Sequence, residues 1–173
     1  MLSRRNLAVS FVAVMLLAML AGCAAGDVQV PDRAVEISMD EALAAQDAAM
    51  AGVLMGSAEW TESQFSSLVT ELIKQNAAGV PIESVKAWFT SEGLVLSVAL
   101  TDGSAVVLSG NVMVEDNRIK VDLTGASALG MSVASPLLDV VEGAINRALD
   151  DPSLGVAVGV NMGEGTLSVA IGQ

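Results

Sequence analysis

Few side chains in this sequence could do chemistry, and their types exclude most catalytic machinery. The 173 residues include no histidine and no tyrosine, and Cys23 is the only cysteine. Nucleophile systems that pair serine or cysteine with histidine are therefore excluded, and so are zinc sites built on histidine and cysteine. A single cysteine also excludes an internal disulfide. We expect no enzyme activity, no cofactor and no metal.

Two arrangements leave a chemical alternative open. A serine could act with Lys74, Lys86 or Lys120 as its base, although each lysine is more typical of a solvated charge. Asp139 and Glu142 lie three residues apart on a predicted helix and could share a cation. Their place near the start of that helix is more typical of a wet face that complements the helix dipole.

The cysteine ends an apolar N-terminal run. Arg4 and Arg5 form a positive start and residues 6–26 carry no charge, an order typical of an export signal. Leu20-Ala21-Gly22-Cys23 resembles the lipobox of bacterial lipoprotein signal peptides. The resemblance implies cleavage before Cys23 and a diacylglyceryl thioether on its sulfur, which would anchor the exported chain to a membrane.

Two alternatives to this export route stay open. The uncharged run would span a bilayer if it were never cut, because about 20 apolar residues suffice. Ser3-Arg4-Arg5-Asn6-Leu7 also resembles a twin-arginine signal, which would change only the route. In the lipoprotein interpretation the protein lies on the outer side of the cytoplasmic membrane, or at the outer membrane if the cell has one.

The charge of the chain limits the classes of partner that it can bind. Its formal net charge is −12, and loss of Arg4 and Arg5 would make it more acidic. Such a charge argues against nucleic acid and against adsorption onto anionic headgroups. The partners that we expect are a membrane, through lipid on Cys23, and either a lipid ligand or an envelope protein.

The sequence divides into a signal peptide at 1–22, a short polar tether at 23–36 and one domain at 37–173. Ser38 and Glu41 have the spacing of a capping box, which predicts a helix to about Val53 whose larger apolar residues share one side. These residues are Met39, Leu43, Met50, Val53 and Leu54.

Two further helices show stronger patterns. Thr61 and Gln64 form a second capping box, with Trp60 and Phe65 placed as a hydrophobic staple. Apolar residues then recur with helical spacing, namely Phe65, Leu68, Val69, Leu72 and Ile73. Ser135-Pro136 begins the third helix. Its apolar stripe comprises Leu137, Leu138, Val141, Ala144, Ile145, Ala148 and Leu149.

After Pro81 the apolar period changes to two. Four alternating segments are separated by turn signals at Glu92-Gly93, Asp102-Gly103 and Asp116-Asn117, and two more strands follow the third helix. The predicted class is α+β, with a curved antiparallel sheet of about six strands packed on two to three amphipathic helices. The expected order is α-α-β-β-β-β-α-β-β, preceded by a signal-peptide helix.

From Trp60 onward the pattern resembles small exported YpmS-like domains, which are related to the TULIP (tubular lipid-binding) superfamily. The stretches WTESQFSSLVTELI, VPIESVKAWFTSEGLVLSVAL, VVLSGNVMVEDNRIKVDLTGASALG, LLDVVEGAINRAL and VNMGEGTLSVAIG carry the resemblance. It implies a curved sheet over helices with an elongated apolar groove between them, and no catalytic residues.

Two functions follow from these patterns. The first is a membrane-anchored envelope lipoprotein that binds a lipid or another apolar ligand in that groove. Its predicted lining is Phe65, Leu68, Leu72, Leu94, Leu96, Val98, Leu137, Val141 and Ile145. The second is a structural or assembly lipoprotein with a solid core and a protein partner. A large apolar pocket favours the first function, whereas a packed interior with an exposed apolar patch favours the second.

Overall fold

The computed structural model describes residues 28–76, 79–128, 131–132 and 135–172. The elements are, in order, α2 (Met39–Met55), β1 (Ser57–Thr61), α3 (Glu62–Asn76), β2 (Ile82–Thr90), β3 (Gly93–Leu100), β4 (Ala105–Glu115), β5 (Arg118–Ala128), β6 (Met131–Ser132), α4 (Ser135–Leu149), the 3₁₀ turn η1 (Pro152–Leu154), β7 (Val156–Gly163) and β8 (Thr166–Gly172). The α+β class is confirmed, and the order matches except for two additional strands, β1 and the two-residue β6. The expected signal-peptide helix and Cys23 lie outside the described residues.

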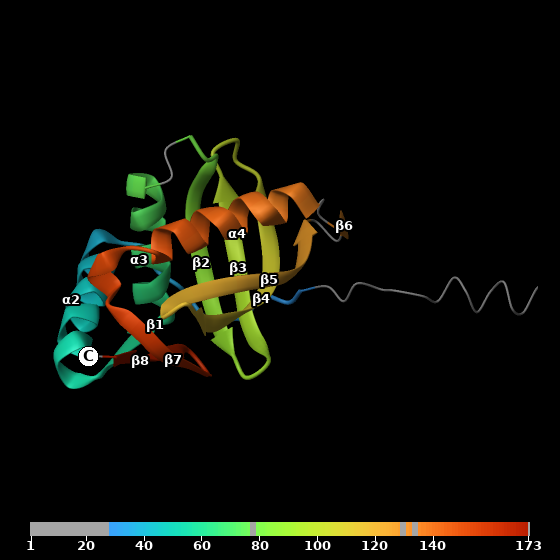
Figure 1. Cartoon of the computed structure of the whole chain (residues 1–173). Helices are drawn as coiled ribbons and strands as arrows, with labels where there is room; N and C mark the ends of the chain where they lie inside the picture. The colour runs from blue at the N-terminus through green and yellow to red at the C-terminus, as the bar shows by residue number, and fades with distance from the viewer. Residues whose placement is uncertain (1–27, 77–78, 129–130, 133–134, 173) are drawn as a thin grey trace, which may run out of the picture.

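The strands form two antiparallel sheets rather than one. Strands β2 to β6 follow chain order in the larger sheet, whereas the smaller sheet has the order β1-β8-β7. Strand β1 pairs with β8 from Ser57 opposite Ala170 to Thr61 opposite Thr166. The second helix therefore begins directly after a strand that is held by the C-terminal end of the chain (Figure 1).

Helix α3 covers the free edge of β2 in the larger sheet. Three alternate backbone N–H groups of β2 donate to three α3 side chains spaced four residues apart: Val85 to Thr70 Oγ1 (3.0 Å), Ala87 to Ser66 Oγ (2.8 Å) and Phe89 to Glu62 Oε1 (2.8 Å). Four helical residues rise about 6 Å and two strand residues about 6.6 Å, so the two ladders match. The polar residues buried in α3 thus replace a neighbouring strand.

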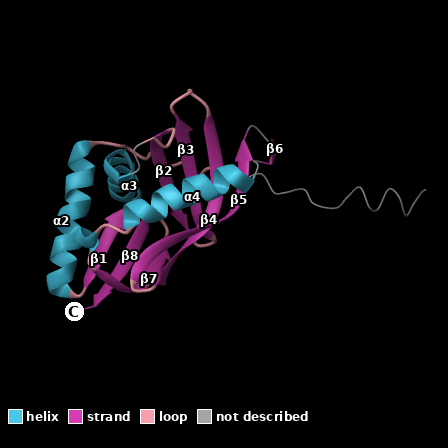
Figure 2. Ribbon diagram, turned by 45° about the horizontal axis from the view of Figure 1, so that its top comes forward, coloured by secondary structure: helices cyan, strands magenta, loops and turns pink. Residues whose placement is uncertain are grey.

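Helix α4 does the same for the part of β5 that the short strand β6 leaves unpaired. The Asn146 side chain pairs with both backbone groups of Val121, and Glu142 Oε2 accepts from the N–H of Leu123 at 2.9 Å. Glu142 and Asn146 are again four residues apart. Figure 2 shows α4 lying across one face of the larger sheet, with α3 beside β2. The two helices therefore reach opposite edges of the curved sheet, α3 at β2 and α4 at β5, and cover its inner face between them.

The local signals for the helix starts are confirmed. Gln64 N–H donates to Thr61 Oγ1 at 3.2 Å, and Gln64 Oε1 accepts from Thr61 N–H at 3.0 Å. The rings of Trp60 and Phe65 pack with their centroids 6.4 Å apart. At the α2 start, Ser38 Oγ accepts from Glu41 N–H, but the N–H of Ser38 donates to Ser67 Oγ instead of to Glu41. This hydrogen bond from the N-cap of α2 to α3 replaces the second half of the capping box formed by Ser38 and Glu41.

Candidate functional site

The residues predicted to line an apolar groove lie in the packed interior. Eight of them are buried in one hydrophobic cluster: Phe65, Leu68, Leu72, Leu94, Leu96, Val98, Val141 and Ile145. The side chain of Leu137 lies outside the described residues. Phe65 also stacks edge-on against Phe89, with the ring centroids 5.2 Å apart. The sequence correctly predicted which of these side chains share the interior, and the groove itself stays a prediction.

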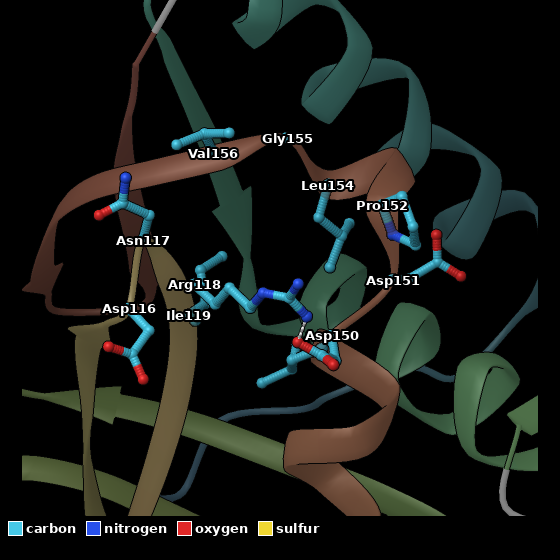
Figure 3. A pocket seen from close by; sticks show the side chains of 11 residues that line it. Asp116, Asn117, Arg118, Ile119, Asp150, Asp151, Pro152, Leu154, Gly155 and Val156 are labelled. Carbon is cyan, nitrogen blue, oxygen red and sulfur yellow. Dashed lines mark ion pairs between the residues drawn. The ribbon is translucent and has the colours of Figure 1, made fainter.

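Two cavities open at the surface of the described part of the chain. One of about 360 Å³ lies between the β4–β5 turn and the segment from α4 to β7 (Figure 3). In Figure 3 Arg118 reaches across this cavity to pair with Asp150, over apolar residues that include Ile119 and Leu154. Another of about 630 Å³ lies beside the β2–β3 turn, and its lining includes Leu94, which was predicted to line the groove.

Three of the residues considered for chemistry have structural partners. Lys74 pairs with Glu71 at 2.7 Å, and Lys120 pairs with Glu115. The hydrogen bond with Glu115 raises the pKa of Lys120 above its ordinary value, because the carboxylate favours the charged ammonium. Glu142, which could have shared a cation with Asp139, instead accepts a hydrogen bond from the N–H of Leu123 on β5. Among the described residues, no cluster of histidine, cysteine, aspartate or glutamate could hold a metal ion.

Residues 28–36 of the predicted tether lie against the domain. Arg33 donates to Glu62 Oε1 at 2.7 Å, to Glu164 Oε2 at 3.0 Å and to the C=O of Phe89 at 2.9 Å. The hydrogen bond with Glu62 is the main reason why the pKa of Arg33 is raised above its ordinary value. The indole of Trp88 donates to the C=O of Arg33, so the segment covers the outer side of β2. This strap joins both sheets to α3.

The least expected feature is the orientation of α2. Its buried positions are small residues, namely Ala42, Ala45, Ala49 and Gly52. A methyl group at Gly52 would lie 2.8 Å from Cβ of Ala58, which is too close, so only glycine fits at that point. The indole of Trp60 donates to the C=O of Ala45 at 2.9 Å and fixes the same face. Close backbone approach therefore decides which side of α2 faces inward.

The larger apolar residues of α2 share one side, as predicted, and that side faces solvent. They form one row along the helix, with exposed fractions of 56% for Met39, 51% for Leu43, 57% for Met50, 41% for Val53 and 82% for Leu54. We call these five residues the α2 row. Apolar residues exposed along one side of a surface helix, here with Gln46 between Leu43 and Met50, are typical of an interaction site.

The surroundings of the α2 row are acidic. Asp40 and Asp47 are exposed on the same helix, which contains no lysine or arginine. In Figures 1 and 2 α2 forms one flank of the molecule, where it packs on α3 and β1. The described chain begins at Val28 on the other side, near Asn111 and Thr124. Within the described residues, no helix has the length and apolarity needed to cross a bilayer.

Comparison with known proteins adds no relative. No family model matches the chain, and neither a curated protein nor a solved structure matches it. The resemblance to YpmS-like domains gains no support from these comparisons and stays a prediction. The functional argument therefore rests on the residues themselves.

Proposed function

We propose that this protein is a membrane-anchored, non-catalytic docking module of the cell envelope, which binds a protein partner through the α2 row. The observation that carries the proposal is the inverted helix: α2 buries its alanines and leaves its methionines, leucines and valine in water. Exposure of this row has a free-energy cost of about 25 cal/mol per Å² of apolar area, which a partner would recover by covering it.

Anchoring is the second part of the proposal and is supported by the sequence around Cys23. Lipid on that sulfur, cleavage before it and export to the outer side of the membrane all follow from the resemblance to a lipobox. Cys23→Ser should leave an uncleaved or soluble chain, whereas the wild-type chain should partition into detergent. Unmodified Cys23 in the membrane fraction, with residues 1–22 still attached, would instead support a spanning anchor.

Binding of lipid between helices and sheet is the other proposal for this chain. We prefer docking because the eight described residues expected to line the groove are at most 2% exposed. A lipid chain would have to separate side chains that already contact one another, and the free energy gained from their packing would be lost.

The docking proposal can be tested by photo-crosslinking in intact cells. A benzophenone amino acid at position 50 should capture one discrete exported protein, identified by mass spectrometry. The same probe at position 113 is the matched control, because Met113 is a partly exposed methionine on β4, away from α2. Leu43→Asp should abolish the product at position 50. Equal products at both positions, or none at position 50, would contradict the proposal.

A further inference from the structure

The spacing of the residues on the outer side of α2, four of them exposed and Gln46 half-buried, specifies the shape of what covers them. Met39, Leu43, Gln46, Met50 and Val53 are separated by four, three, four and three residues. This is the a/d repeat of a coiled coil, sustained over two heptads, with Met39, Gln46 and Val53 at d and Leu43 and Met50 at a. Such a narrow seam accepts the side chains of one facing helix, whereas a membrane surface selects for a broader apolar face.

The flanks of the seam differ from each other. On the g side, Ala42 and Ala49 are buried against the domain. On the e side, Asp40 and Asp47 are exposed and Leu54 continues the apolar surface. A helix lying on this seam therefore meets carboxylates along one flank only. Residues at e and g decide which helices pair, because they face each other across the seam.

We infer that the α2 row binds an amphipathic α-helix of a partner protein that carries lysine or arginine beside its apolar seam. This inference rests on the proposed docking function and names the partner's chemistry. The seam extends about 22 Å, from the rise of 1.5 Å per residue, so it accommodates about four turns of the partner. Gln46 lies at the centre of the seam and disfavours shifted registers, as single polar seam residues do.

Charge argues against two other occupants. A second copy of α2 in antiparallel pairing would bring Asp40 and Asp47 of one chain against the same residues of its partner, on molecules that each carry a net charge of −12. An anionic membrane surface would be repelled in the same way. A basic helix is attracted by the carboxylates. Exposed ion pairs are individually weak, so the apolar seam provides most of the affinity and the charges provide selectivity.

The test uses two synthetic peptides and the full chain in phosphatidylcholine nanodiscs. Both peptides have 18 residues with leucine at a and d, and they differ only in lysine or glutamate at e and g. Fluorescence anisotropy should show saturable binding of the lysine peptide, roughly tenfold tighter than the glutamate peptide, with the preference lost at high salt. Met50→Asp should abolish binding, and Met113→Asp should not.

Charge reversal gives the most specific readout. The double variant Asp40→Lys/Asp47→Lys should prefer the glutamate peptide. Glu92→Lys/Asp122→Lys has the same net charge change at exposed sites away from α2 and should keep the preference for lysine. Thermal melts would verify that each variant folds. Peptide binding that ignores Met50→Asp, or a preference that does not reverse, would overturn the inference.

Other results would assign the row to a different occupant and overturn the inference directly. Self-association that Met50→Asp abolishes would indicate a second copy of the chain. Flotation of the Cys23→Ser chain with phosphatidylglycerol vesicles, lost when Met50→Asp is added, would indicate a membrane.

A crosslinked exported partner without binding of either peptide would leave the docking function standing and exclude only the basic helix. Peptide binding without any crosslink at position 50 in cells would contradict the docking function itself.

Discussion

The side-chain amide of Asn146 satisfies both backbone groups of Val121: its oxygen accepts from the N–H at 2.7 Å, and its nitrogen donates to the C=O at 2.9 Å. One amide thus occupies the place that a neighbouring strand would take at the edge of β5. Because these backbone groups are partly buried, they have no full access to water as an alternative partner.

Asn146→Ala should therefore destabilise the fold by about 1–3 kcal/mol, since it leaves a donor and an acceptor without partners. Urea unfolding would measure the loss. Asn161→Ala is the matched control, because Asn161 is exposed on β7, and its effect should stay within about 0.5 kcal/mol. Equal effects of the two substitutions would show that the edge contact contributes nothing particular.

The strap predicts a change that tryptophan fluorescence can follow. Arg33 holds the segment on Glu62 and Glu164, while its C=O accepts from the indole of Trp88, which is only 5% exposed. Arg33→Ala should loosen the segment and increase acrylamide quenching of Trp88, with a stability loss on the order of 1 kcal/mol. Trp60 is fully buried elsewhere and should not respond.

The control for this experiment removes the reporter. In a Trp88→Phe background, Arg33→Ala should leave quenching unchanged, because the remaining tryptophan is enclosed by α2 and α3. Quenching that rises by the same amount with and without Trp88 would indicate general loosening of the core rather than release of the strap.

The lowered pKa of Glu164 predicts that part of the folding stability is lost in acid. The backbone N–H of Ser91 and the guanidinium of Arg33 lower the pKa of Glu164 below the ordinary value of 4.5. A lowered pKa in the folded state means that the ionised form is stabilised by folding. Its contribution is present above the ordinary pKa and is lost as the pH falls through the folded one. Glu164→Gln should be less stable than wild type near neutral pH, and the difference should shrink as the pH falls below 4.5.

Urea midpoints measured from about pH 6 to pH 3 would check this dependence. Glu92→Gln, at an exposed position in the adjacent turn, is the control and should follow the wild-type curve. A constant difference between Glu164→Gln and wild type across that range would show that the ionised carboxylate is not the cause.

The sequence predicted the elements whose signals are local and missed what depends on distant partners. The staple of Trp60 and Phe65 and the turn at Asp116-Asn117, whose φ angles are 51° and 61°, are as expected. Strand β1 has only five residues, and its partner β8 lies more than a hundred residues away. No local pattern distinguishes such a segment from a helix cap, so the strand was not predicted.

The α2 row was missed for a different physical reason. Periodicity groups large apolar residues on one side and predicts that this side faces the core. Burial of α2 is instead decided by how closely its backbone approaches the domain, since the inward positions are alanines and, beside Ala58, a glycine where even a methyl group would clash. An alanine-rich helix offers two faces that could pack inward, and the periodicity of its larger residues does not distinguish them.

The interior provides the last prediction, and it separates the two proposed functions. Leu96 and Val98 on β3 face Leu68 and Ile145 of the helices within one cluster, and all are at most 1% exposed. If this interior is solid, the purified chain should carry no lipid beyond any modification of Cys23, and its melting temperature should not change with added fatty acid. Native mass spectrometry and thermal melts measure both.

A fluorescent fatty acid should show no saturable uptake, because an entering chain would have to displace side chains that are packed at the density of a crystal. Leu96→Ala offers the positive control: it would open a cavity and cost about 2–5 kcal/mol, so a small apolar probe should raise its melting temperature and not that of wild type. Saturable uptake by the wild-type chain, with a co-purified lipid, would instead establish the groove that the periodicity suggests and would make the α2 row secondary to it.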